Sequence, residues 1–359
     1  MEIESIVKQV KYNCNISDAR YWGNYSICGL LMRLRELYMQ EHGIGSGQSV
    51  SKNDIMDWIA EREALWEVLE SAAFEDIDID GHKYEPFDSS GINQALNKHG
   101  LIYSGGYGMF GKPMFFLARL KFMSHVSAYG IYYSDSEYCR DLSTSMAMVQ
   151  GQNIFVRLEP LRAFLWEKVS ELQCGKSRAA LREAFGHYGI SDKQFLSLSQ
   201  QEAQEKGSQA VATVCQDVAE MIALHELGEA AENEIAPLWL DILESATDRL
   251  TEFYLRAIKD VLADTTLQGP LKLVISNESK PLVHFYIAFL DGLRKELFPE
   301  VIDAYKDFAD TGNRALLEQA RISGYTRLDN IRKEILDIWD NTESSQCIES
   351  FIKSRFKRG

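Results

Sequence analysis

A histidine and two glutamates share one face of a predicted helix around residue 225. With 100° of rotation per residue, Glu229 lies at about 40° and Glu232 at about 340° from His225. An apolar stripe occupies the same face, as expected for a helix packed on a core. The stripe consists of Val211, Val214, Val218, Met221 and Ile222. Because a buried carboxylate is costly unless it is paired or bound to a metal, this face must meet a countercharge.

Imidazole and carboxylate groups at this spacing are typical metal ligands. The segment from His225 to Glu229 resembles the zinc-peptidase helix motif His-Glu-x-x-His, whose histidines bind zinc and whose glutamate is the general base. His225 matches the first ligand, and Glu226 matches the base and is the candidate catalytic residue. Glu229 replaces the second histidine, which argues against a peptidase, although a carboxylate can itself ligate zinc or iron.

A metal site between helices of a bundle fits these residues better. Bundles that bind two metals project Glu and Glu-x-x-His ligands inward from facing helices, although that strict spacing is absent here. We expect metal ligands from two helices. They are His225, Glu229 and Glu232 on the first helix, and His284 and Asp291 on the second. The expected cofactor is a divalent metal (iron, manganese or zinc), and the many carboxylates favour redox chemistry over hydrolysis.

A second interpretation needs no metal. The buried glutamates would pair with arginines such as Arg162, Arg178 or Arg294. The protein would then be a non-enzymatic helical interaction protein whose buried salt-bridge network fixes the register of its helices. In a third interpretation, the last turn of the helix is simply exposed at Gly228.

A glycine-rich loop matches the phosphate-loop pattern Gly-x-x-x-x-Gly-Lys at Gly106, Gly111 and Lys112. Pro113 replaces the serine or threonine that would hold magnesium, and a β-prone run follows where a helix should begin. We therefore interpret the loop as a hairpin turn.

The elements that must position these residues are mostly helical. A helix capped by Asn15 or Ser17 is predicted to run to about Glu41, a second begins near Ser51, and a third follows Ser89. Residues 101–141 are aromatic, β-prone and punctuated by glycine, which predicts a small antiparallel hairpin or three-stranded sheet. Beyond residue 152 the candidate helices span 153–173, 176–187, 192–233, 235–264, 281–298, 299–311, 313–340 and 343–356.

These patterns predict a mainly α protein of two domains, as its length suggests. Residues 1–152 would form a helical N-terminal domain with a small antiparallel β element, and residues 153–359 a C-terminal helical bundle.

The composition of the chain indicates which classes of binding partner and which cellular location to expect. The chain of 359 residues has 53 acidic and 38 basic side chains and a net charge of −15, which disfavours binding to nucleic acid or to an anionic membrane. No apolar run is long enough to span a bilayer, and the N-terminus does not look like a signal peptide. Six cysteines without a Cys-x-x-Cys pair suggest reduced thiols. We expect a cytoplasmic protein that acts on a small molecule.

Three segments together resemble a known family. Residues 14–23, Cys-Asn-Ile-Ser-Asp-Ala-Arg-Tyr-Trp-Gly, followed by residues 28–36, are similar to the opening of an uncharacterised bacterial family of two-domain proteins. The segments around residues 225–229 and 290–294 fit the same family. This resemblance covers most of the chain and implies two domains, but it implies no activity.

Overall fold

The structure, a computed structural model, describes residues 2–45, 48–108, 111–173, 179–190, 198, 200–278 and 281–356. The chain divides into two compact units, Met1–Glu167 and Lys168–Gly359. Each unit is described by itself below.

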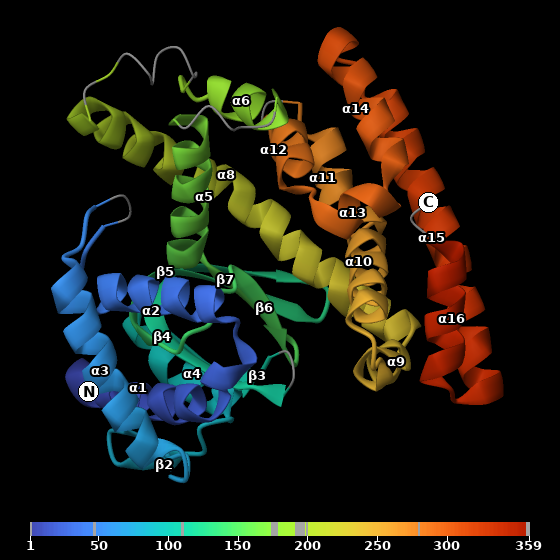
Figure 1. Cartoon of the computed structure of the whole chain (residues 1–359). Coiled ribbons are helices and arrows are strands. Elements are labelled where there is room, and N and C mark those ends of the chain that lie inside the picture. The colour runs from blue at the N-terminus through green and yellow to red at the C-terminus, as the bar shows by residue number, and fades with distance from the viewer. Residues whose placement is uncertain are drawn as a thin grey trace. The chain divides into compact units, whose positions relative to one another are not determined.

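A five-stranded mixed sheet forms the centre of the first unit, with strand order β3-β4-β5-β7-β6 (Figure 1). All neighbouring strands pair antiparallel except β5 and β7, which are parallel. The strands are β3 (Leu101–Tyr107), β4 (Pro113–Val126), β5 (Tyr129–Arg140), β6 (Ala147–Gln150) and β7 (Asn153–Arg157). A separate two-stranded hairpin joins β1 (Ile77–Ile79) to β2 (His82–Tyr84).

The predicted helical N-terminal domain with a small antiparallel element is therefore wrong. The sheet is larger than expected, is mixed, and continues to Arg157, so the helix predicted over 153–173 begins later, at Leu158. Asn153–Arg157 is rich in β-branched and aromatic residues and pairs with two strands at once, which favours the extended conformation. The glycine-rich loop joins two strands that pair antiparallel, β3 and β4, as predicted for a hairpin, and its residues 109–110 lie outside the described residues.

The first unit also contains the helices α1 (Ile3–Tyr21), α2 (Ile27–Glu41), α3 (Lys52–Leu69) and α4 (Ser89–Leu96), with short 3-10 turns at Trp22–Asn24 and Asn97–His99. Of these, α1, α2 and α4 contact the five-stranded sheet, and α3 packs against α1 and α2. The core between α1 and the sheet contains Ile6, Val10, Cys14, Phe115, Leu117 and Cys139. Ser51 caps α3 as predicted, because its side chain accepts a hydrogen bond from the backbone N–H of Asp54.

The helix cap predicted at Asn15 or Ser17 is wrong, because both residues lie inside α1 with buried side chains. The cap of α2 is Ser26, whose hydroxyl accepts from the N–H of Gly29. Asn15 instead accepts a hydrogen bond from Arg62, and Ser17 donates one to the carbonyl of Pro113. Helical periodicity alone does not separate a capping hydroxyl from one that bonds to a distant strand.

The second unit is helical throughout its described residues. Helix α5 (Leu158–Gln173) crosses the boundary between the units. The helices that follow it are α6 (Ala179–Gly186), α8 (Gln200–Ile235), α9 (Trp239–Ser245), α10 (Arg249–Thr265), α11 (Pro270–Ser276), α12 (Leu282–Phe289), α13 (Gly292–Leu297), α14 (Pro299–Thr311), α15 (Ala315–Thr342) and α16 (Ser345–Arg355). The long α8 lies along α10, which also packs against α15 (Figure 1). No described helix is long and apolar enough to cross a membrane.

Two of the helices predicted in this unit are divided in the structure. The predicted helix 281–298 breaks between α12 and α13, where Asp291 is extended and Gly292 has a φ of +50° that favours glycine. The predicted helix 235–264 breaks before α10, where the side chain of Asp248 caps the new helix by accepting from the N–H of Thr251. His284 and Asp291 consequently do not share one helical face, contrary to the prediction.

Candidate functional site

Helices α8 and α10 approach closely beside His225. A Cβ atom on Gly228 would lie 2.3 Å from the carbonyl oxygen of Ala263, so only glycine permits this approach. Gly269 encloses the same carbonyl from another side, at 2.1 Å from its own ideal Cβ position. The close approach brings Asp264, the residue after Ala263, opposite His225.

The two ring nitrogens of His225 have different neighbours. Nδ1 lies 2.8 Å from Oδ1 of Asp264, and the hydroxyl of Tyr286 donates to Oδ2 of the same carboxylate at 3.0 Å. Nε2 faces Oε1 of Glu229 at 3.5 Å. Burial alone would lower the pKa of His225, but the negative charges of Asp264 and Glu229 raise the pKa well above its ordinary value. Asp264 thus fixes the orientation of the ring.

Glu229, on the Nε2 side of this imidazole, and Asp260 of α10 both lie close to His225. One ligand atom from each of His225, Glu229 and Asp260 lies within 4.8 Å of the other two. Oε2 of Glu229 also accepts a hydrogen bond from Nζ of Lys259 at 3.0 Å. Burial alone would raise the pKa of Glu229, but the hydrogen bond from His225 and the charge of Lys259 outweigh it, and the pKa falls below its ordinary value.

Two further carboxylates near His225 carry a charge that their surroundings do not fully compensate. Burial raises the pKa of Glu226 to about 7, although the positive charge of His225 opposes this shift. Burial also raises the pKa of Asp260 to about 6, and the charge of Glu229 adds to the effect. Raised pKa values of this kind indicate a place that would favour an additional cation.

An open pocket of about 320 Å³ adjoins Asp260. It is lined by Phe253, Arg256, Ala257, Asp260, Asp291, Gly292, Leu293 and Arg294. Asp291, a predicted ligand, therefore lies in the same pocket as Asp260 and not beside His284. The charges of Asp264 and Asp260 raise the pKa of Arg294, although burial opposes the shift, so Arg294 stays cationic at the edge of the site.

Glu232, one turn further along α8, belongs to a different network. It is buried, and Arg332 on α15 donates to its Oε2. The hydroxyl of Tyr325 donates to its Oε1 at 3.3 Å. Glu232 is thus paired with an arginine, as the metal-free interpretation predicts for a buried glutamate, but the partner is Arg332 and not one of the three arginines proposed. Of those, Arg162 pairs with Asp135 in the first unit, and Arg178 lies outside the described residues.

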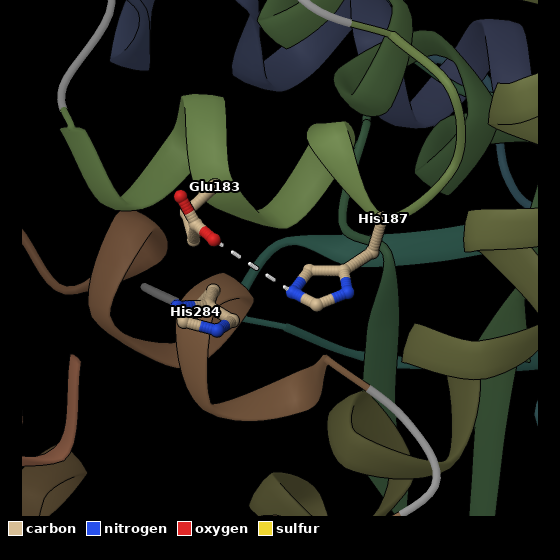
Figure 2. A group of neighbouring side chains, drawn as sticks. All are labelled: Glu183, His187 and His284. Carbon is tan, nitrogen blue, oxygen red and sulfur yellow. Dashed lines mark ion pairs between the residues drawn. The ribbon is translucent and has the colours of Figure 1, made fainter. Parts of the chain in front are cut away.

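His284 lies in a fourth place, on α12. Its Nδ1 lies 2.9 Å from the hydroxyl of Tyr305, and its ring stacks on that of His187 with 5.3 Å between centroids. Glu183, on α6, completes a group of three possible ligands with these two histidines (Figure 2). The five predicted metal ligands are therefore distributed over four neighbourhoods, and only His225 and Glu229 are brought together.

Two family models match most of the chain. One is described as Family of unknown function (DUF6866) N-terminal domain and covers residues 5–157. The other is described as Family of unknown function (DUF6866) C-terminal domain and covers residues 162–357. The chain belongs to this family. The predicted resemblance to an uncharacterised two-domain family is confirmed, and no curated protein or solved structure matches the chain.

Sequence reasoning missed several residues that surround His225 in this DUF6866 chain. Lys259, Asp260 and Asp264 all come from α10 and follow His225 by more than thirty residues in the sequence. The sequence did contain a signal for Asp264, because this acidic residue directly follows the apolar run Val261-Leu-Ala. The structure shows that the run and Asp264 are buried. Glu183 and His187, spaced four apart at the end of α6, were also missed.

Proposed function

We propose that this protein is a metal-dependent enzyme and that its metal binds to Nε2 of His225 and to the carboxylates of Glu229 and Asp260. One observation carries the proposal. One ligand atom from each of His225, Glu229 and Asp260 lies within 4.8 Å of the other two, and Asp264 holds Nδ1 of His225 while Nε2 faces Glu229. Metal-binding histidines commonly donate their other ring N–H to a carboxylate, which fixes the ring and its tautomer. The Asp264–His225 pair has this arrangement.

The donor set supports iron or manganese ahead of zinc. One imidazole and two carboxylates make a harder, oxygen-rich set than the sites that select zinc. We therefore retain redox chemistry over hydrolysis. Glu226 remains the candidate acid–base residue, because a carboxyl with a pKa of about 7 exchanges protons readily at neutral pH.

The pocket beside Asp260 is the candidate place for a substrate. Its volume of about 320 Å³ suits a small molecule. Arg294 and Asp291 would offer it one positive and one negative group, which supports a polar small molecule as the substrate. The cytoplasmic location and the lack of nucleic-acid and membrane partners, predicted from the cysteine pattern and the charge, stay predictions.

A metal-free function remains the second candidate, and a specific contact favours it. Lys259 already pairs with Glu229 at 3.0 Å, and Arg332 pairs with Glu232. In that case these two ion pairs would hold α8 in register with α10 and with α15. The protein would then be a non-enzymatic helical interaction protein. Loss of one partner from such a pair is costly, whereas loss of both is often neutral.

Metal binding by the full-length protein decides between the two candidates. We expect about one equivalent of Mn²⁺ or Fe²⁺ per chain at this site, measured by elemental analysis and anaerobic titration calorimetry. His225→Ala and Asp260→Asn should abolish that binding, whereas Glu220→Gln, an exposed site on the same helix, should leave it unchanged.

Two results would overturn the metal proposal. One is the absence of stoichiometric metal together with unchanged stability in chelator. The other is mutual rescue, in which Glu229→Gln and Lys259→Met are each destabilising but the double variant recovers the stability of the wild type. That second result would support the interaction protein.

A further inference from the structure

A second cluster of potential ligands lies away from His225, where α6 meets α12. Glu183 and His187 are four residues apart on the last turn of α6 and just beyond it, and His284 lies on α12 (Figure 2). One ligand atom from each of the three lies within 4.8 Å of the other two. Oε1 of Glu183 is 4.0 Å from Nε2 of His187, the pair joined by the dashed line in Figure 2.

Buried aromatic packing holds the two helices together at this point. Phe185 on α6 and Phe285 on α12 are both fully buried, and their rings meet edge to face with 5.3 Å between centroids. Each phenylalanine is next to or near a ligand in sequence: Phe185 lies between Glu183 and His187, and Phe285 follows His284. The core therefore holds the backbone positions from which the three ligands project.

His284 is oriented for a ligand at its second nitrogen. The side chain is buried, and Nδ1 is held by the hydroxyl of Tyr305 at 2.9 Å. In the tautomer in which Nδ1–H donates to this hydroxyl, the lone pair lies on Nε2 and the ring is held in place, as the outer partners of metal-bound histidines do. Tyr305 comes from α14, so a third helix contributes to the arrangement.

The two stacked imidazoles are more favourable as neutral rings that bind a metal than as two protonated rings. The rings of His284 and His187 stack with 5.3 Å between their centroids, so protonation of both would place two positive charges side by side. A neutral imidazole is the form that donates its lone pair to a metal. Without a metal, the cluster contains an exposed i, i+4 pair, and such pairs stabilise a helix only slightly.

We propose that Glu183, His187 and His284 form a second metal site, which binds zinc or a similar transition-metal ion. Two imidazoles and one carboxylate are the protein ligands of several zinc sites that keep the fourth position open. With metal–ligand distances of about 2.1 Å, tetrahedral ligand atoms stand about 3.4 Å apart. The exposed side chains of Glu183 and His187 can close the remaining gap by rotation, since 63% and 50% of their surfaces are accessible.

This site is separate from the proposed His225 centre and shares no residue with it. Its donor set also differs, because it has two nitrogens and one oxygen whereas the His225 centre has one nitrogen and two oxygens. The richer imidazole content favours zinc here. The two proposals can therefore fail independently.

The test uses full-length apo protein titrated with Zn²⁺ by calorimetry and with Co²⁺ by visible absorption, whose intensity reports a four-coordinate site. His187→Ala is the main variant because its side chain is exposed and the fold should tolerate the change. Loss of an outer partner costs about 10–100-fold in metal affinity, so loss of this ligand should weaken Zn²⁺ binding by at least about 100-fold. Tyr305→Phe, which removes only the hydroxyl, should weaken it about tenfold.

Two control variants make the outcome specific. His125→Ala removes an exposed histidine of the first unit and should change nothing. His225→Ala should leave Zn²⁺ binding at this second site intact, even if it removes metal from the first. The proposal is overturned if Zn²⁺ binds with equal affinity to the wild type and His187→Ala, or if the wild type gives no four-coordinate Co²⁺ spectrum.

Discussion

His225 illustrates how one side chain can have two separate roles. Asp264 holds Nδ1 at 2.8 Å, and the hydroxyl of Tyr286 in turn holds Asp264. Nε2 then remains for other partners, and it faces Glu229. The value of this arrangement for metal binding depends on Asp264, which does not itself belong to the group of converging ligand atoms.

Asp264→Asn is therefore expected to weaken metal binding without removing a ligand. The amide still accepts one hydrogen bond but no longer carries the charge that orients the ring and raises its basicity. We expect about 10–100-fold lower affinity for Mn²⁺ by calorimetry. Asp241→Asn, an exposed change of the same type on α9, is the control. Equal affinities of the Asp264 variant and the wild type would remove Asp264 from the proposed centre.

The carboxylate of Glu318, on α15, has a lowered pKa and therefore makes stability depend on pH. Hydrogen bonds from Arg321 and Lys272, together with their charges, lower the pKa of Glu318 from the ordinary 4.5 to about 2, although burial opposes the shift. Because the folded pKa lies below the unfolded one, the ionised carboxylate stabilises the fold above about pH 4.5. That contribution is lost as the pH falls towards 2.

Glu318→Gln should consequently be less stable than the wild type at pH 7, by about 1 kcal/mol after allowance for solvent screening. The difference should shrink steadily between pH 5 and pH 3. Urea denaturation at several pH values measures both quantities. A deficit of the same size at pH 3.5 and pH 7 would show that packing, and not charge, is responsible.

At the scale of elements, the site depends on how closely α8 approaches α10. Gly228 on α8 and Gly269 after α10 both leave room for the carbonyl of Ala263. The glycine within the His225–Glu229 segment is thus required by the neighbouring helix. The possibility that α8 ends exposed at Gly228 is wrong, because Gly228 is buried and α8 continues to Ile235.

Gly228→Ala should separate the two helices and displace Asp264 from His225. Alanine normally stabilises a helix interior by about 1 kcal/mol relative to glycine, but overpacking against a backbone atom typically costs about 1–3 kcal/mol. We expect a net loss of about 1–2 kcal/mol in denaturation, together with weaker metal binding. Gly186→Ala is the matched control, since nothing lies within 4 Å of its ideal Cβ. Similar stabilities of the two variants would contradict the close approach.

At the scale of the molecule, the first unit has a buried charge network of its own. Nζ of Lys112 lies 3.0 Å from Asp18 and 3.7 Å from Asp141. Burial raises the pKa of Asp18 to about 6, although the charge of Lys112 opposes the shift. The lysine of the apparent phosphate loop is thus a buried partner of the conspicuous Asp18 of residues 14–23, which explains both residues without a ligand.

Lys112→Met should therefore destabilise the first unit and leave metal binding by the second unit unchanged. Removing one partner of a buried ion pair costs about 3–5 kcal/mol at pH 7. The folded pKa of Asp18 is higher than its ordinary 3.8, so acidification protonates it in the folded state first, and the deficit should shrink towards pH 5. Hydrogen exchange localises the loss, and calorimetry measures metal affinity. Loss of metal binding in this variant would show that the units are not energetically independent.

Local patterns predicted several individual elements correctly. Ser51 caps α3, α2 ends near Glu41 before Gly43, and the glycine-rich loop joins two strands that pair antiparallel. The size of the sheet was underestimated because β5 pairs in parallel with β7, and β6 lies between these two strands in the sequence. Pairing between segments that are distant in sequence leaves little trace in a local pattern.

The sequence by itself determined that His225 and Glu229 share a helical face and must meet countercharges, because helical periodicity and the cost of burying charge are local properties. It also indicated the two-domain family. Tertiary structure decided which groups meet that face: Asp264, Lys259 and Asp260 from α10. It also separated Glu232, His284 and Asp291 from His225. The physical reason is that these partners depend on how helices cross, and here α8 approaches α10 closely where Gly228 meets the carbonyl of Ala263.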